Sequence, residues 1–244
     1  MCPREPALSA EPPGGAALIV VMACLTVATG VLDAVSFLAL GQIFTATQTG
    51  NLLFLGFGVA GQGGLPVVAT VVSLGAFAVG AALGGRLESA VAARRRHWFP
   101  LALLVEALLL VGAGLAAWER GSAGELPQSQ RYTVIALMAV AMGMRNVTAM
   151  RVGAPDLATT VETRAMTALV SGSRLGRDTR MGYGTHAAGR RLISVGSMLA
   201  GGLLGAGLLA AGLRPSPVLL LVAVTVAALG LVVPRLVRRQ LAAG

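Results

Sequence analysis

Thr45-Ala-Thr-Gln-Thr49-Gly50-Asn51 is a hydroxyl-rich stretch that opens a short apolar run ending near residue 60. A comparable stretch, Thr159-Thr-Val-Glu-Thr163-Arg164-Ala165, opens a second run that ends near residue 171. As helices, 45–60 and 159–171 would be at most about 24 Å long, which is short of a hydrocarbon core of roughly 30 Å. Two short helices with polar starts, at matching places in two halves, are typical of a transporter-like membrane protein.

The composition predicts an all-α polytopic membrane protein. The chain has 244 residues, of which 55% are hydrophobic and only 12% are charged. A soluble domain of this length could not bury so much apolar surface, so a lipid bilayer is the expected partner. The polar segments are the tails 1–15 and 234–244 and the loop 119–131. The six predicted spans are 16–38, 65–85, 99–118, 132–150, 192–213 and 218–233.

The basic residues favour one topology. The net charge is +9 and every basic residue is an arginine, so a soluble protein of this composition would suggest nucleic acid. Here most arginines lie between apolar segments, where the positive-inside rule accounts for them without a nucleic-acid partner. Suppose that each short helix returns to the membrane side from which its own connector entered. Both termini are then cytoplasmic, and the basic clusters all lie inside. The arginines then inside are those at 4, 86, 94–96, 174, 177, 180, 190, 191, 235, 238 and 239, against 120, 131 and 214 outside.

The two halves resemble each other residue by residue, at offsets of 113 to 121 positions. The matches include Gly30-x-x-Asp33 with Gly143-x-x-Asn146, the threonine pairs 45/49 and 159/163, glycines 75/80/84 with 196/201/205, and Pro100 with Pro217. A duplication explains these matches, with a first repeat at 16–118 and a second at 132–233. Three spans separate the repeats' starts, so the repeats point in opposite directions. The fold predicted is six transmembrane helices plus two short re-entrant or broken helices, arranged as two inverted repeats.

In this arrangement the starts of the two short helices would meet near the membrane midplane. A helix start presents unpaired N–H groups and a partial positive charge, which suits a small polar or anionic solute. The threonines are alternatively simple helix caps and packing hydroxyls. The predicted substrate-binding residues are Asp33, Thr45, Thr49, Gly50, Asn51, Arg145, Asn146, Thr159, Thr163 and Arg164.

Ionisable residues within the apolar segments are costly and usually face a cavity or one another. We expect Asp33 to face the centre of the molecule with Arg145 or Arg164 as its partner. It is either a structural ion-pair member or a carboxylate that couples protons or binds substrate. Glu106 has no counterpart in the second half, and its role is open. Glu162 lies near the second short helix and is a further candidate partner for the arginines.

Other kinds of site are not predicted. The sequence contains no Ser/His/Asp set, CxxC pair, phosphate-binding loop or dinucleotide fingerprint, so no catalytic residue, cofactor or metal is expected. Cys2 and Cys24 lie in different settings, and His97 and His186 are isolated in basic loops. The glycine ladders predict close helix packing within the chain, with a homodimer face as the lesser alternative.

Two motifs resemble a known family. Gly30-Val-Leu-Asp33-Ala-Val-Ser-Phe and Gly41-Gln-Ile-Phe-Thr-Ala-Thr-Gln-Thr49-Gly50-Asn51 look like the signature of the YoaK family. Gly143-Met-Arg-Asn146 and Thr159-Thr160-Val-Glu-Thr163 are similar to its second motif. The resemblance implies a bacterial inner-membrane protein with a domain of unknown function, and it supplies no substrate. Arg145 and Arg164 depart from that family's pattern, in which glutamine and glycine are common.

The sequence therefore leads to two classes of function. The first is a small-solute transporter or permease with a site at the two opposed helix starts, or a channel built on the same two short helices. The second is a non-transporting membrane scaffold or sensor subunit, in which the paired short helices serve only packing. An enzyme is not expected.

Overall fold

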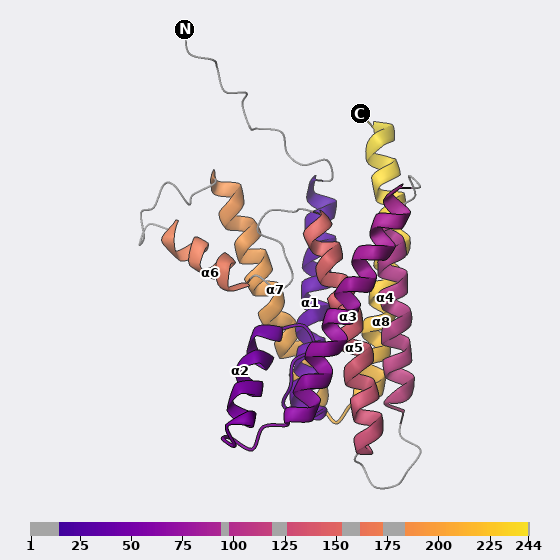
Figure 1. Cartoon of the computed structure of the whole chain (residues 1–244). Coiled ribbons are helices and arrows are strands. Elements are labelled where there is room, and N and C mark those ends of the chain that lie inside the picture. The colour runs from indigo at the N-terminus through magenta and orange to yellow at the C-terminus, as the bar shows by residue number, and fades with distance from the viewer. Residues whose placement is uncertain (1–14, 94–97, 119–125, 153–161, 173–183, 244) are drawn as a thin grey trace.

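A computed structural model describes residues 15–93, 98–118, 126–152, 162–172 and 184–243. Within these ranges the chain forms eight helices and no strand (Figure 1). The helices are α1 (Gly15–Ala39), α2 (Gln48–Val59), α3 (Val67–Ala93), α4 (Trp98–Ala116), α5 (Gln128–Val152), α6 (Glu162–Ser171), α7 (Gly184–Ala210) and α8 (Pro215–Ala243).

Six of these helices, α1, α3, α4, α5, α7 and α8, are long and apolar enough to cross a membrane. The other two are too short: α2 has 12 residues and α6 has 10. At 1.5 Å per residue they measure about 18 Å and 15 Å, against a core of roughly 30 Å. The prediction of a polytopic α-helical protein with six spans and two short helices is confirmed.

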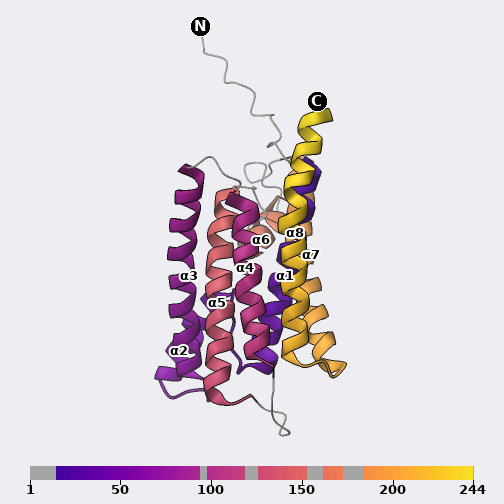
Figure 2. The same ribbon diagram turned by 90° about the vertical axis from the view of Figure 1, so that its right-hand side faces the viewer.

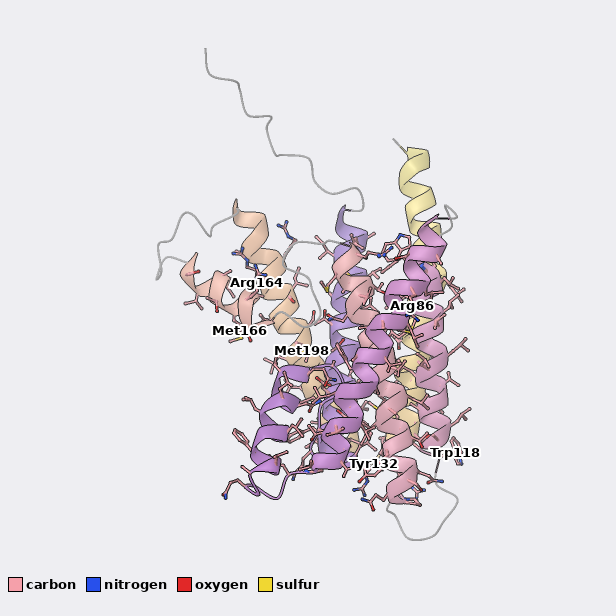
Figure 3. All side chains as sticks on the ribbon, viewed as in Figure 1. Arg86, Trp118, Tyr132, Arg164, Met166 and Met198 are labelled. Atoms are coloured by element: carbon pink, nitrogen blue, oxygen red, sulfur yellow. The ribbon has the colours of Figure 1, made fainter. Side chains whose placement is uncertain are left out.

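The short helices occupy opposite ends of the bundle. After α1 the chain turns at Gly41, whose φ is 122°, and returns into the bundle before α2 begins (Figure 1). Helix α2 then runs back towards the end from which α3 starts, while α6 lies beside the other end of α7. Figure 3 shows Trp118 and Tyr132 at the end of the bundle where α2 lies, and Arg164 on α6 towards the opposite end of the bundle. Trp and Tyr at a helix end are typical of a membrane interface.

The long helices pair across the two halves of the chain. Helix α1 packs on α7, α5 packs on α3, and α4 packs on α8. Figure 2 shows α3, α5, α4 and α8 standing side by side. The buried hydrophobic core is built mainly from α1, α4, α5 and α8, so these four helices form the centre of the molecule.

Glycines allow two of these helix pairs to approach backbone to backbone. A Cβ atom at Gly201 of α7 would lie 2.2 Å from the Val27 carbonyl oxygen of α1. A Cβ atom at Gly80 of α3 would lie 2.1 Å from the Val140 carbonyl oxygen of α5. The predicted close packing of the glycine ladders is confirmed for these positions. Gly75, the first member of its ladder, faces open space instead.

Several predicted boundaries are wrong. The first short helix begins at Gln48 rather than Thr45, because the backbone N–H groups of residues 45–47 bind a side chain on α1 instead of continuing a helix. Helix α7 begins at Gly184, so Arg190 and Arg191 lie on a helix and not in a loop. Helix α8 continues to Ala243, through most of the predicted tail.

The predicted start of the second short helix, at Thr159, lies outside the described residues, and within those residues the two short helices do not meet. Helix α2 packs on α3 and α6 packs on α7, and α2 and α6 make no contact with each other in the described ranges. Each short helix therefore lies against the second long helix of its own half. The connector that precedes α6, residues 153–161, lies outside the described residues.

Candidate functional site

Asp33 of α1 organises the connector that leads into α2. Its Oδ1 accepts hydrogen bonds from the backbone N–H groups of Thr45 (2.9 Å) and Ala46 (2.8 Å). Its Oδ2 accepts from the N–H (3.1 Å) and the hydroxyl (2.6 Å) of Thr47. The Thr45 hydroxyl adds a longer contact at 3.4 Å. Irregular backbone inside a bilayer must be satisfied by protein groups, and this carboxylate does so for three consecutive residues.

Asn51 holds the connector from its other side. Its Oδ1 accepts a hydrogen bond from the N–H of Phe44 at 2.9 Å, and its Nδ2 donates to the carbonyl oxygen of Phe44 at 2.6 Å. Ser73 of α3 donates to the same carbonyl oxygen at 2.7 Å. Gln48 accepts from Asn51 Nδ2 at 2.8 Å and donates to the Thr45 carbonyl oxygen at 2.8 Å. This polar network fixes α2 to α3 through Asn51 and Ser73, which are fully buried, and through Gln48, which is half-buried.

A groove of about 300 Å³ lies beside the Asp33 carboxylate. Its walls come from α1, the connector and α7, and its polar residues are Asp33 and Thr47. Two aromatic rings line it, Phe37 and Phe44, which stack with centroids 5.1 Å apart. The remaining lining residues are small or aliphatic: Gly30, Ala34, Leu38, Met198, Gly202 and Ala206.

The site lies about halfway between one end of the bundle and its middle. Asp33 is six residues before the end of α1, and Ser73 is six residues after the start of α3. Six residues correspond to about 9 Å of helix, whereas half of a 30 Å core is about 15 Å. Measured from these helix ends, the site would lie about 6 Å from the centre of such a core, and the midplane location stays a prediction.

The start of α2 offers few free donors to an anion. The three N–H groups that precede it bind Asp33, the N–H of Gln48 donates to the Ala46 carbonyl oxygen, and that of Gly50 donates to the Thr47 carbonyl oxygen. The hydroxyl of Thr47, the residue before the helix, also points to Asp33 rather than capping α2. A carboxylate of the protein thus takes the place that an anionic solute was expected to occupy.

Arg145 is not the partner of Asp33. It forms a buried salt bridge with Glu106 of α4, and both side chains are at most 2% exposed. Arg145 Nη1 also donates to the Leu25 carbonyl oxygen and to the Thr29 hydroxyl of α1, at 2.9 Å each. Glu106, whose role was open from the sequence, therefore neutralises an arginine that joins α1, α4 and α5. The sequence could not pair them, because they are 39 residues apart on different helices.

The other predicted residues are divided between several places. Thr45 and Asn51 are buried beside Asp33, and Gly50 lies against the Phe44 ring. Thr49 is exposed on α2, and Thr163 and Arg164 are exposed on α6. Asn146 is half-buried on α5, and Thr159 lies outside the described residues. The predicted site residues of the second half that the structure describes thus do not line the groove beside Asp33, whose second-half wall comes from other residues of α7.

Five residues of the site were missed by the sequence analysis: Phe37, Phe44, Thr47, Gln48 and Ser73. Two of them carried a usable signal. Gln48 and Asn51 are three residues apart and so share one face of a helix. Ser73 is one of only two hydroxyl residues, with Thr70, in the apolar span 65–85. The phenylalanines gave no such signal, because aromatic residues in an apolar segment are ordinarily packing residues.

Replacing Asn51 by alanine should loosen the start of α2. The change leaves the N–H of Phe44 without its side-chain acceptor, at an expected cost of about 1–3 kcal/mol, while the Phe44 carbonyl oxygen keeps its bond from Ser73. We expect a lower melting temperature of the purified protein in detergent, measured by intrinsic fluorescence. The neighbouring change Leu52→Ala is the control, since Leu52 is 59% exposed. Equal melting temperatures for the two variants would contradict the role given to Asn51.

Comparison with known proteins places the chain in a family. The family profile described as "Protein of unknown function (DUF1275)" matches residues 21–232. The chain is 27% identical, over 154 residues, to the UPF0700 transmembrane protein YoaK of Bacillus subtilis (strain 168). That alignment covers 60% of this chain and 62% of the relative's length. No solved structure matches the chain. The chain, a multi-pass membrane protein with the helices described above, therefore belongs to the DUF1275 family.

Proposed function

We propose that this protein is a small-solute transporter or permease whose site is the groove beside Asp33. The observation that carries the proposal is the interrupted segment at residues 40–47, where irregular backbone enters the bundle and a carboxylate holds it next to a groove. Non-helical backbone at membrane depth is tolerated where it is buried in protein or lines a cavity, and broken helices form the sites of many transporters. A channel with the same architecture would use the same residues.

The proposal includes an inverted repeat with its axis in the membrane plane. Contacts between the halves support it, because they recur at the offsets of the sequence repeat. A Cβ atom at Gly30 would meet the Met198 carbonyl oxygen at 2.6 Å, and one at Gly143 would meet the Phe77 carbonyl oxygen at 2.2 Å. Gly30 and Gly143 differ by 113 positions, and Phe77 and Met198 differ by 121, as in the sequence matches. Two such halves could rock against each other about their glycine contacts.

A specific observation favours a second candidate, a non-transporting scaffold or sensor subunit. The carboxylate of Asp33 already accepts bonds from three N–H groups and two hydroxyls. A carboxylate offers about four lone-pair sites, so these donors nearly saturate it. On this view Asp33 has a structural role, and the groove is a space between helices.

Flux measurements separate the two candidates. Purified protein in liposomes should take up at least one member of a panel of radiolabelled amines, amino acids, carboxylates and sugars faster than protein-free liposomes. Thr47→Val, which removes the groove hydroxyl, should lower that flux at least tenfold. Thr225→Val is the matched control, because the Thr225 hydroxyl bonds only within α8, to the Leu221 carbonyl oxygen at 2.9 Å. If no compound on the panel crosses faster than in protein-free liposomes, the scaffold candidate is favoured.

We further propose that both termini are cytoplasmic in the bacterial inner membrane. The turn after α2 would then face outside and the end of α6 inside. In a variant without Cys2 and Cys24, Gln62→Cys should react with an impermeant maleimide in intact cells. Gly172→Cys should react only after the cells are opened. Labelling of both positions from one side would contradict the inverted arrangement of the short helices.

A further inference from the structure

Among the described residues that line the groove, Asp33 alone carries a formal charge, and this charge is negative. Asp33 is 4% exposed, and in the described ranges no arginine forms a salt bridge or hydrogen bond with it. Arg145, one of the two arginines predicted as its partner, is neutralised by Glu106 instead. The groups that donate hydrogen bonds to Asp33 are all neutral: three peptide N–H groups and two hydroxyls. Ionisable groups in a bilayer usually have a partner of opposite charge, and none of the described residues is such a partner for Asp33.

The other chemistry of the groove suits a cation with an apolar surface. The rings of Phe37 and Phe44 line it, and ammonium groups are attracted to aromatic faces within about 6 Å of the ring centroid. The third ring of the cluster, Phe54, stacks on Phe44 with centroids 5.9 Å apart but does not line the groove. Among the described side chains of the groove, Thr47 is the one hydrogen-bond donor, and its hydroxyl is bound to Asp33. An anion would therefore meet a carboxylate and no free donor.

We propose that this groove binds a small organic cation of the substituted-ammonium class. Asp33 provides the opposite charge, and Phe37 and Phe44 provide the aromatic wall that contacts the alkyl groups. The volume of about 300 Å³ is sufficient for a quaternary ammonium with a short side chain. Transport of such a cation rests on the proposed function, whereas its binding does not. This assignment replaces the anionic solute that the free helix start had suggested.

Three compounds of one shape and different charge test the proposal. Choline is cationic, 3,3-dimethylbutan-1-ol is its neutral carbon analogue, and 3,3-dimethylbutanoate is the corresponding anion. Equilibrium binding to purified protein is measured with radiolabelled choline and by competition with the other two. We expect choline to bind at least tenfold more tightly than the alcohol, and the anion not to compete. Equal binding of choline and the alcohol, or tighter binding of the anion, would overturn the proposal.

Variants assign the binding to this groove. Asp33→Asn, which keeps an acceptor oxygen, should weaken choline binding at least tenfold. Phe37→Leu keeps an apolar wall but loses the ring, and it should weaken binding about threefold to thirtyfold. The matched control Phe54→Leu, in the same aromatic cluster but outside the groove, should stay within twofold of the parent. If Asp33→Asn does not fold, the two phenylalanine variants decide the question, and equal effects of both overturn the assignment.

Failure of this inference and failure of the proposed function give different results. Choline binding without flux of any solute means that the groove is a cation site in a protein that does not transport. Flux of another solute, with no binding of choline, means that the protein transports but that the groove does not select cations.

Discussion

Removing either member of the Glu106–Arg145 salt bridge should cause a large loss of stability. Glu106→Ala leaves a buried guanidinium without its carboxylate, and Arg145→Ala leaves a buried carboxylate without its guanidinium. Breaking a buried pair in this way costs about 3–5 kcal/mol, which corresponds to a melting temperature lower by roughly 10 °C for a chain of this size. The measurement is thermal unfolding of the purified protein in detergent, followed by intrinsic fluorescence.

The double variant Glu106→Leu/Arg145→Met separates the charge from the packing. Both charges are absent, and the side chains retain similar volume, so we expect at least half of the lost stability to return. The remaining partners of Arg145 keep their own bonds, because the Thr29 hydroxyl also donates to the Leu25 carbonyl oxygen at 3.0 Å. Arg86→Met is the control for loss of an exposed arginine. A double variant as unstable as the sum of the single variants would show that the pair has no coupling energy.

The salt bridge also shows which part of the structure the sequence could predict. Hydropathy depends on the residues of one segment alone, so it located six spans and two segments too short to cross. The glycine ladders likewise predicted close helix packing, which the structure shows at Gly80 and Gly201. Charge partners depend on which helices are neighbours and how each is rotated, and neither is visible in a single segment. Asp33 was therefore assigned an arginine, whereas the structure gives it the backbone of its own connector.

The error at Asp33 has a physical origin that applies to other broken helices. An apolar segment that re-enters a bilayer leaves peptide N–H groups unpaired, and these groups need acceptors as much as a carboxylate needs donors. A carboxylate 12 residues before Thr45, on the preceding helix, can meet that need without a basic side chain. In the sequence alone, Asp33 is a charge that needs a basic partner, and the helix start is a separate donor site. In the structure each satisfies the other, so the start of α2 is closed to an anion.

Alanine substitutions at Gly80 and Gly201 should also cause a large loss of stability. The loss should be similar for Gly80, in the first half of the chain, and Gly201, in the second. The added Cβ atom would lie 2.1 Å from the Val140 carbonyl oxygen in the first case and 2.2 Å from the Val27 carbonyl oxygen in the second. These contacts are with backbone atoms, which cannot rotate away, so the paired helices must separate. Overpacking of this kind costs about 1–3 kcal/mol, and more where the backbone must move. Reduced melting temperatures of both purified variants are the expected result.

The same ladders contain the control for this prediction. Gly75 of α3 and Gly196 of α7 are the first members of the two matched ladders, and an added Cβ atom at either position has no atom within 4 Å. Alanine is a better helix former than glycine by about 1 kcal/mol, so Gly75→Ala and Gly196→Ala should leave stability unchanged or slightly raised. Losses of equal size at all four positions would mean that Gly75 and Gly196 are also packed, as in a homodimer face. Loss at only one of Gly80 and Gly201 would contradict the equivalence of the two helix pairs, on which the proposed inverted repeat depends.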